Sequence, residues 1–428
     1  MKRRFVIAVV ALAAIGNCAS GQLTLDYCLE RAEDNYPLIS RYELVSRTGE
    51  LSLSDINKGW LPRIGVYGQA TVQNVVPSFP EALEGVLDRM GQEMKGLGRL
   101  QYKAGVDLTQ TIWDGGQSKA QREVERATTA ESEAALDVRM YGVRESVQKL
   151  FFGILLMDEQ IAQTRQTISL LEANHAKLQA MVRNGVALQS DADMVEAQAL
   201  AMAQTLAEAE GALASYRSAL ELYVGESIDG QKPVRPSAEI PADMTSNRPE
   251  LKLYESQLQT NIARTKAVGV TSMPRIGLFA QAYYGYPGLN YFESMMNRNL
   301  SFNLVAGVKV SWTIDSFYTK KNARDKIALA SAGVDADREL FLFNSDMQTR
   351  TQLASIRALE EVTKQDARIV ELRTEVRRAA ESQLRNGVID TTALLTKITD
   401  ENIAGLNARY HEIQLLQDIY ELKHTLNR

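Results

Sequence analysis

Few residues of this chain are placed to do chemistry. The three histidines, His175, His411 and His424, are scattered and have no cysteine or carboxylate partner at metal-ligand spacing, so solvated helix positions explain them better than a metal site. No nucleophile stands with a base, and no glycine-rich loop is of the kind that cradles a phosphate. The sequence therefore predicts no enzyme, no cofactor and no metal site.

The N-terminus is typical of an export signal. Three basic residues at positions 2–4 precede an apolar run over 5–15, so residues 1–21 are predicted to be a signal peptide and the mature chain to begin at Gln22. This apolar run is too short to span a bilayer as a helix. Lipidation at Cys18 is the alternative.

Charge and cysteine content narrow the choice of partners. Removal of three basic residues from a chain of formal net charge −5 leaves −8, and no basic patch stands out, so no nucleic-acid partner is expected. Cys28 is then the only cysteine and cannot form an internal disulfide; we expect it on an apolar helix face with Leu25, Leu29 and Ala32. The mature chain has no run of the ~18 apolar residues that a membrane helix needs, so it can enter a membrane only as strands.

The chain is an internal duplication in two registers. One set of residues recurs 212 positions later: Asn35, Pro37, Pro62, Arg63, Ile64 and Gly65 return as Asn247, Pro249, Pro274, Arg275, Ile276 and Gly277. Another set recurs after 202: Gly105, Thr111, Ile112, Arg183, Asn184, Gly185 and Val186 return as Gly307, Thr313, Ile314, Arg385, Asn386, Gly387 and Val388. The slip between the registers indicates one variable loop per copy, longer in the first. The first copy is predicted to span 22–230 and the second 246–428, with a connector at 231–245.

Four short segments in the duplicated chain alternate apolar and polar residues with a period of two. They are residues 62–73, 102–113, 275–286 and 302–314, and loops at 75–100 and 287–301 are expected to join them in pairs. Each has about the 9–11 residues that a tilted transmembrane strand requires, with one apolar face for lipid and one polar face for a wet lumen. An antiparallel sheet packed on a soluble core would show the same alternation.

The tryptophans favour the membrane interpretation. Trp60 precedes the first strand, Trp113 ends the second and Trp312 lies near the end of the fourth. All three therefore fall at the same edge of the two hairpins, as an interfacial aromatic girdle would require.

Four strands cannot close a membrane barrel, for which about eight is the practical minimum. An open sheet edge in lipid leaves backbone groups unpaired, so the chain must form oligomers. Two copies would give eight strands and three would give twelve; the strand argument does not choose between them.

The remaining sequence predicts long helices. Residues 115–184 and 316–385 form two stretches of about 105 Å at 1.5 Å per residue, each ending at an Asn-Gly pair. Ser190 and Thr392 are expected to be the N-caps of shorter returning helices. The returning helices are predicted at 190–224 and 392–427, and further helices before the strands at 24–58 and 246–270.

Several duplicated motifs carry a family resemblance. They are the Pro-Arg-Ile-Gly strand starts, Trp113-Asp114-Gly115-Gly116, Asn247-Arg248-Pro249-Glu250-Leu251, and the turns Asn184-Gly185-Val186 and Asn386-Gly387-Val388. In this order they make the chain similar to the TolC-like outer-membrane efflux and secretion channels over residues 22–428. The resemblance implies a mainly α-helical homotrimer in which four strands per chain close one twelve-stranded β-barrel in the outer membrane. It also implies a helical tunnel through the periplasm of a Gram-negative bacterium and no catalytic site.

The resemblance also assigns roles to the helix turns. It implies that Asn184, Gly185, Val186, Asn386, Gly387 and Val388 form a periplasmic tip that docks a periplasmic adaptor protein coupled to an inner-membrane transporter. Carboxylates just beyond the glycines close such channels, which makes Asp191, Asp193 and Asp390 the candidate gate, although the second copy has Ala393 in place of Asp191. Asp191 is equally explained as a helix N-terminal charge.

The function expected from these features is a passive exit duct of a tripartite efflux pump or a type I secretion system. The alternative is a non-channel periplasmic adaptor or scaffold, which would not need four amphipathic strands. Drugs, metal ions and polypeptides would all pass through a wide polar lumen.

Overall fold

The computed structural model describes residues 22–78, 80–91 and 96–428, so the predicted signal peptide and Cys18 lie outside the described residues. The chain divides into two units. The first comprises the described part of 1–43 together with 134–253 and 336–428, and the second comprises 44–133 and 254–335. Each unit takes segments from both predicted copies, so the units do not coincide with the repeats.

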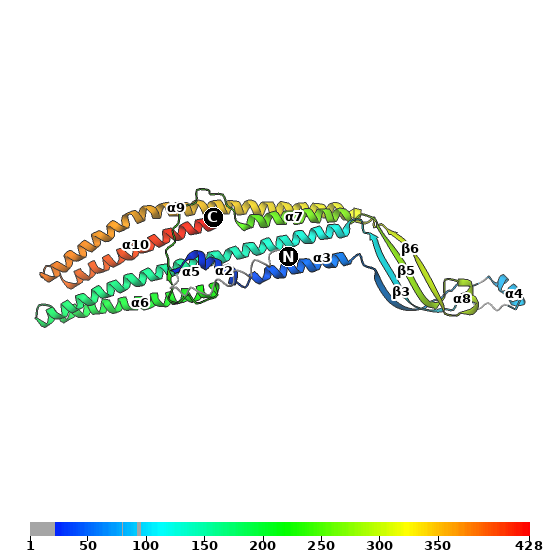
Figure 1. Cartoon of the computed structure of the whole chain (residues 1–428), viewed down its shortest axis with the longest axis horizontal. Helices are drawn as coiled ribbons and strands as arrows, with labels where there is room; N and C mark the ends of the chain where they lie inside the picture. Colours follow the sequence, from blue (N-terminus) through cyan, green and yellow to red (C-terminus); the bar gives the residue numbers. More distant parts are fainter. Residues whose placement is uncertain (1–21, 79, 92–95) are drawn as a thin grey trace, which may run out of the picture. The chain divides into compact units, whose positions relative to one another are not determined.

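One antiparallel sheet of four strands lies in the second unit. Its strands are β2 (Arg63–Val72), β3 (Leu100–Trp113), β5 (Arg275–Tyr286) and β6 (Ser301–Ser311). Their spatial order is β2-β3-β5-β6, so the two hairpins join through β3 and β5 (Figure 1). All four predicted strands are confirmed, with ends displaced by three residues at most.

Two short helices stand in the segments predicted to be plain loops. They are α4 (Glu81–Arg89) between β2 and β3, and α8 (Tyr291–Asn297) between β5 and β6. The sequence carried a signal for α4 that the prediction missed, because Pro80 is followed by Leu83, Val86 and Met90 at helical spacing.

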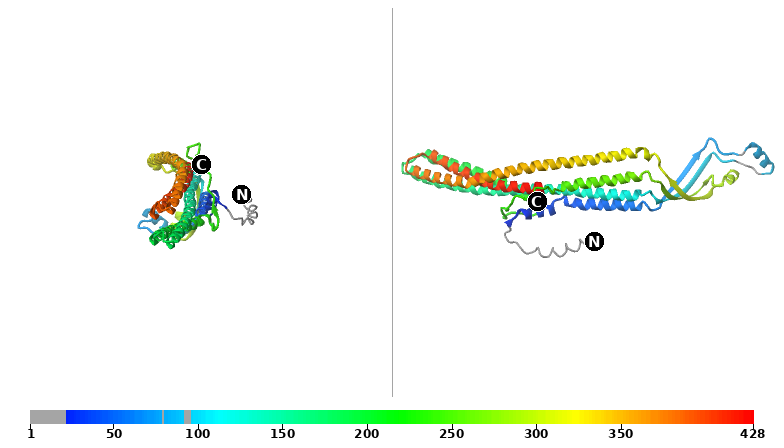
Figure 2. Two further views of the ribbon diagram at one scale, coloured as in Figure 1. Left: turned by 90° about the vertical axis from the view of Figure 1, so that its left-hand side faces the viewer. Right: turned by 90° about the horizontal axis from the view of Figure 1, so that it is seen from above.

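Long helices account for most of the remaining chain. Their bounds are α2 (Leu25–Asn35), α3 (Ile39–Lys58), α5 (Gln117–Arg183), α6 (Gln189–Val224), α7 (Pro249–Val270), α9 (Ser316–Arg385) and α10 (Thr391–Leu426). Helices α5 and α9 contain 67 and 70 residues, whereas the returning helices α6 and α10 contain 36 each, as predicted. Figure 2 shows the two hairpins that they form. Two short strands, β1 (Gln22–Leu23) and β4 (Lys232–Pro233), pair in parallel in the first unit.

Among the described residues, no helix has the combination of length and apolarity needed to cross a membrane.

The helix predicted over 24–58 is wrong, because it is two helices. Tyr36 has an extended backbone (φ −64°, ψ 130°), and Pro37 follows it. A residue before proline is driven out of the helical region by the proline ring, so α2 ends at Asn35 and α3 begins at Ile39.

The duplicated asparagines Asn35 and Asn247 each contact the C-terminus of a helix. The Asn35 side-chain amide donates to the carbonyls of Leu222 (3.2 Å) and Tyr223 (3.1 Å) at the C-terminus of α6. In the second copy the Asn247 backbone N–H donates to the carbonyl of Leu426 (2.9 Å) at the C-terminus of α10. Both therefore satisfy carbonyls that a helix end leaves without intrahelical partners, Asn35 through its side chain and Asn247 through its backbone.

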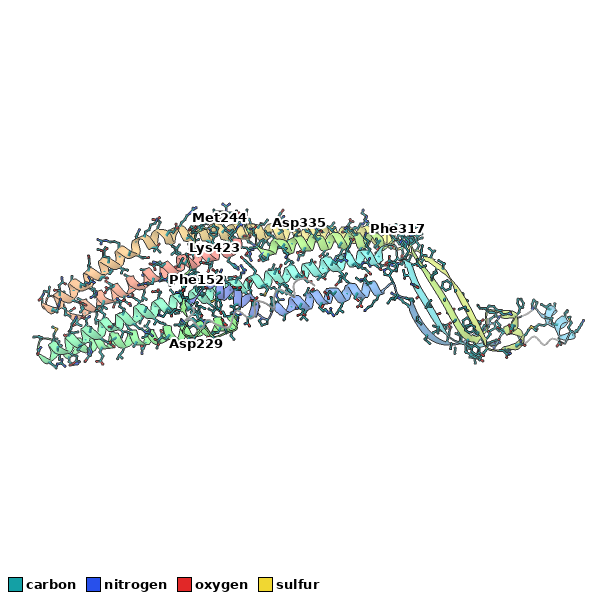
Figure 3. All side chains as sticks on the ribbon, in the orientation of Figure 1. Phe152, Asp229, Met244, Phe317, Asp335 and Lys423 are labelled. Carbon is teal, nitrogen blue, oxygen red and sulfur yellow. The ribbon has the colours of Figure 1, made fainter. Side chains whose placement is uncertain are left out.

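The first unit has an ordinary apolar core. Phe151 and Phe152 of α5 (Figure 3 labels Phe152) pack with Leu25 of α2 and Leu220 of α6, all within one buried cluster. Cys28 lies in the same cluster, as predicted, and burial raises the pKa of its thiol to about 12. This thiol therefore stays protonated and unreactive at neutral pH.

A capped turn joins β3 to α5. The Asp114 carboxylate accepts from the backbone N–H groups of Gly116 (2.9 Å) and Ser118 (2.6 Å). Partial burial opposes ionisation, but these bonds outweigh it and hold the pKa of Asp114 below its ordinary value. Gly115 has φ +70°, and a Cβ there would meet the Met273 Cβ at 2.5 Å. The Asp-Gly-Gly motif is thus a strand-to-helix junction.

Gly105 gives a test of sheet packing. A Cβ on Gly105 would lie 2.5 Å from the Ala282 carbonyl oxygen and 2.7 Å from the Tyr283 Cβ, whereas a Cβ on Gly65 would meet nothing within 4 Å. We predict that Gly105→Ala destabilises the protein by about 1–3 kcal/mol through overpacking. Gly65→Ala is the matched control and should be neutral or slightly stabilising. Thermal unfolding of the detergent-solubilised variants checks this; equal midpoints would contradict the crowding.

Candidate functional site

The sheet has one continuous apolar face. The register places Val66 opposite Val106, Val106 opposite Ala282, and Ala282 opposite Leu304. The next row of the sheet also places apolar residues opposite one another, with Ala280 between Leu108 and Ala306. The larger side chains are mostly uncovered, since Val66 is 83% and Leu304 60% exposed, while Ala282 is half-buried. A face of this kind is suited to an apolar solvent.

The opposite face is polar, and some of its side chains contact one another. Tyr67, Gly105, Tyr283 and Asn303 form one rung across the four strands. The Lys103 ammonium lies 5.9 Å from the ring centre of Tyr67 and 5.4 Å from that of Tyr283. Beside them the Gln281 side-chain amide donates to the Asp107 carboxylate at 2.7 Å. This face can line water, which would solvate the exposed charges of Arg63, Arg275 and Lys309.

A β-bulge corrects the predicted faces of β3. The register shifts between Thr111 and Trp113, and Trp113 lies opposite Ile276 on the apolar side. Strict alternation would have placed Trp113 on the polar face. A bulge adds one residue to a strand and re-aims the side chains there, and nothing in the alternation of β3 signals it.

The tryptophans lie at one end of the sheet, as predicted. Trp60 precedes the start of β2, Trp113 ends β3 and Trp312 follows β6, and these are the same end because the strands are antiparallel. The indole N–H of Trp312 donates to the Ser272 carbonyl (3.0 Å), while the ring stays 58% exposed. An amphipathic ring anchored by its polar atom is typical of a membrane interface. The aromatic girdle itself stays a prediction.

The two outer strands leave the sheet open. β2 and β6 each have one neighbour within the described residues, and they run in opposite directions because three antiparallel pairings separate them. A second copy can therefore place its β2 beside β6 in antiparallel pairing. Such head-to-tail contacts form a ring where the rotation between copies closes.

Both Asn-Gly turns have the same hydrogen-bonded geometry. In the first, Gly185 (φ +73°) donates to Val182 and Val186 donates to Met181, both at 2.9 Å. In the second, Gly387 (φ +68°) donates to Leu384 (3.0 Å) and Val388 donates to Gln383 (2.9 Å). These are the two bonds of a Schellman motif, which needs a left-handed residue and so explains the duplicated glycines.

The two turns belong to one packed end of the first unit. Leu178 of α5, Val195 of α6, Ala380 of α9 and Leu394 of α10 lie in a single buried cluster. Beyond the turns, the Thr392 hydroxyl contacts the Met194 sulfur at 3.7 Å. The prediction that turns 202 residues apart in sequence lie together in space is confirmed.

Apolar side chains cover the outside of this packed end. Val186 is 66% exposed and Val388 69% exposed, with Leu188 similarly open. Exposed apolar residues that follow a rigid turn are suited to a protein partner.

The predicted N-caps are wrong. Ser190 and Thr392 lie inside the first turns of α6 and α10, and the caps are Leu188 and Asp390. The Asp390 carboxylate accepts from the Ala393 N–H at 2.8 Å. A carboxylate accepts this bond more strongly than the Thr392 hydroxyl would, and it also faces the positive end of the helix dipole.

The other candidate gate carboxylates have partners in their own chain too. Asp191 accepts from the Leu188 N–H (3.1 Å), and Asp193 accepts from the Gln189 side chain (2.7 Å). All three lie just beyond the turns, so the structure brings them to one end of the first unit.

The histidines are half-buried and not the fully solvated residues that were predicted, and His175 lies 3.7 Å from Glu196. His411 contacts Asp366 at 2.9 Å, and His424 stacks on Tyr141 with ring centres 4.3 Å apart. Burial lowers the pKa of His424. In the part of the chain that the structure describes, no three His, Cys, Asp or Glu side chains are placed to hold a metal ion.

The comparisons with known proteins agree on one fold, and one family model matches part of the chain. Residues 56–226, which contain β2, β3, α5 and α6, match the family described as outer membrane efflux protein. No curated protein sequence matches the chain. The predicted resemblance to TolC-like outer-membrane channels is confirmed over these residues.

Three solved structures share the fold. The outer membrane protein VceC from Vibrio cholerae is 12% identical, with TM-score 0.70 over 94% of this chain and 95% of its own. The CmeC outer membrane channel of Campylobacter jejuni is 12% identical, with TM-score 0.67 over 94% and 85%. The MtrE outer membrane channel of Neisseria gonorrhoeae is 15% identical, with TM-score 0.66 over 94% and 88%. At such identities the likeness concerns the fold, and it extends over the second copy as well as the first.

Two substitutions of Asp390 distinguish its role as a helix cap from the effect of its charge. We predict that Asp390→Ala lowers the free energy of unfolding by about 1 kcal/mol, because the Ala393 N–H loses its acceptor. Asp390→Asn keeps an acceptor and removes the charge, so it should lose only the few tenths of a kcal/mol that the charge gains from the helix dipole and leave single-channel conductance in planar bilayers unchanged. A higher conductance of Asp390→Asn would instead show that the charge itself closes the channel.

Proposed function

We propose that this chain is the outer-membrane channel of a tripartite efflux pump or a type I secretion system. Three copies close their sheets into one twelve-stranded barrel, with the apolar face toward lipid and the polar face toward a wet lumen. The helical hairpins of the three copies form the periplasmic tunnel. The chain acts as a passive duct and performs no catalysis.

One observation carries the proposal, namely the register of the sheet. Apolar side chains face one another on the same side across all four strands, from Val66 to Leu304, although the strands belong to hairpins far apart in sequence. A soluble sheet would bury that face, whereas here it is exposed. A helical scaffold would gain nothing from it.

The number of copies follows from two considerations. Four strands per chain fall short of the ~8 that close a membrane barrel, and the opposed directions of β2 and β6 allow a ring of any size. Two copies would give eight strands and three would give twelve. The resemblance to TolC-like channels favours three.

Native mass spectrometry in detergent tests the assembly. We predict three times the mass of one processed chain, because only a ring pairs the backbone groups of β2 and β6. A stable folded monomer would contradict the shared barrel. A dimer would support an eight-stranded ring in place of the twelve-stranded one.

The helix turns are proposed to dock the periplasmic adaptor. This rests on the exposed Val186 and Val388 beside rigid glycine turns, and on the packing that holds the two turns together. The adaptor in turn couples the channel to an inner-membrane transporter.

A charge at these valines tests the docking. We predict that Val186→Asp combined with Val388→Asp abolishes transport in the native host and co-purification of the adaptor, because a carboxylate in an apolar contact is costly to desolvate. The glycines remain, so the trimer should persist. Leu222→Asp, at an 80% exposed position near the other end of α6, is the control and should leave transport intact. Normal adaptor binding by the double variant would contradict the docking role.

A further inference from the structure

The two loops at the outer end of the sheet are fixed to each other. Leu97, Tyr286 and Met295 form a small buried cluster with Val76 packed against it. The Gly98 N–H donates to the Tyr286 hydroxyl at 2.5 Å, and the Arg298 guanidinium donates to the Gly96 carbonyl at 3.0 Å. The base of the β2–β3 loop is thereby held on the β5–β6 loop of the same chain.

Helix α4 stands beyond this anchor with its apolar face open. Leu83, Val86 and Met90 follow one another at spacings of three and four, which places them on one side of the helix. Their exposed fractions are 45%, 52% and 73%. Asp88 lies on the opposite side and is also exposed. The apolar side of an amphipathic surface helix normally packs on another part of the protein, while its polar side faces water. In a single copy the apolar side of α4 is exposed instead.

The β5–β6 loop exposes apolar side chains at the same rim. Leu289 and Tyr291 are 50% and 54% exposed, and Leu300, directly before β6, is 40% exposed. These residues are left over after Tyr286 and Met295 have packed against the chain's own β2–β3 loop. Figure 1 shows α4 and α8 beyond the same end of the strands.

The topology of the sheet brings these two surfaces together between copies. The α4 loop follows Val72 at the end of edge strand β2, and the β5–β6 loop precedes Ser301 at the start of edge strand β6. When β6 of one copy pairs antiparallel with β2 of the next, these strand ends meet at one rim. The α4 face of one copy then stands over the seam, next to the exposed Leu289, Tyr291 and Leu300 of its neighbour.

We propose that α4 of each copy packs its apolar face on the β5–β6 loop of the neighbouring copy, which makes one clasp per seam at the outer mouth. The partner is a second copy of this chain, and the inference rests on the ring assembly proposed above. Apolar contacts formed outside the sheet add to the backbone pairing of β6 with β2 and fix which edges meet.

Disulfide trapping tests the clasp. Cys28 is buried, so cysteines introduced at the rim react alone. Val86→Cys with Tyr291→Cys, oxidised in intact outer membranes, should convert most of the protein to a covalent trimer on non-reducing gels. Met90→Cys with Leu289→Cys is a second pair with the same expectation. Asp88→Cys with Tyr291→Cys is the matched control on the polar side of α4 and should remain largely monomeric on the gel.

Other outcomes would overturn the clasp. A disulfide within one chain would place α4 on its own β5–β6 loop. Covalent dimers from Val86→Cys alone would mean that α4 helices meet each other around the axis. No cross-linking by either pair in a protein that native mass spectrometry shows to be trimeric would leave the channel intact and refute the clasp alone, whereas a wild-type protein that is not a ring would refute both.

Discussion

Backbone hydrogen bonding in a solvent without water is the constraint on which this protein depends. An unpaired N–H or C=O in hydrocarbon costs several kcal/mol, so a sheet that enters lipid must have every strand paired on both sides. This chain supplies four strands and leaves β2 and β6 with one neighbour each among the described residues. The fold of a single copy is therefore incomplete in the energetic sense, and its edges determine how copies can associate.

The two units of the chain differ in where their apolar side chains lie. In the first unit, side chains such as Phe151 and Ile154 are withdrawn from water in the usual way. In the second, residues such as Val66 and Phe302 remain on the outside, while tyrosine, lysine and glutamine share the other face. Helices α5 and α9 run through both units, so single helices pass from one kind of packing to the other.

Repetition in the sequence made much of the fold predictable. Alternation with a period of two gave all four strands, and the paired Asn-Gly turns gave both helical hairpins, because each pattern has one simple geometric meaning. The break at Tyr36-Pro37 could have been predicted as well, since the restriction before proline is local. The bulge near Trp113 could not, because it depends on how β3 fits β5. The competition between Asp390 and Thr392 for the cap of α10 depended on where the preceding turn ended, which sequence patterns place only within a residue or two.

The paired Schellman turns have a consequence for symmetry. One chain carries two turns that share Asn-Gly-Val but differ just after it, where Ala187 and Leu188 in the first copy correspond to Ile389 and Asp390 in the second. A ring of three chains would thus present six turns of two alternating kinds. A partner that reads only the shared tripeptide meets six equivalent positions, whereas a partner that reads the next two residues meets three. Gene duplication would in this way give a threefold assembly a pseudo-sixfold surface.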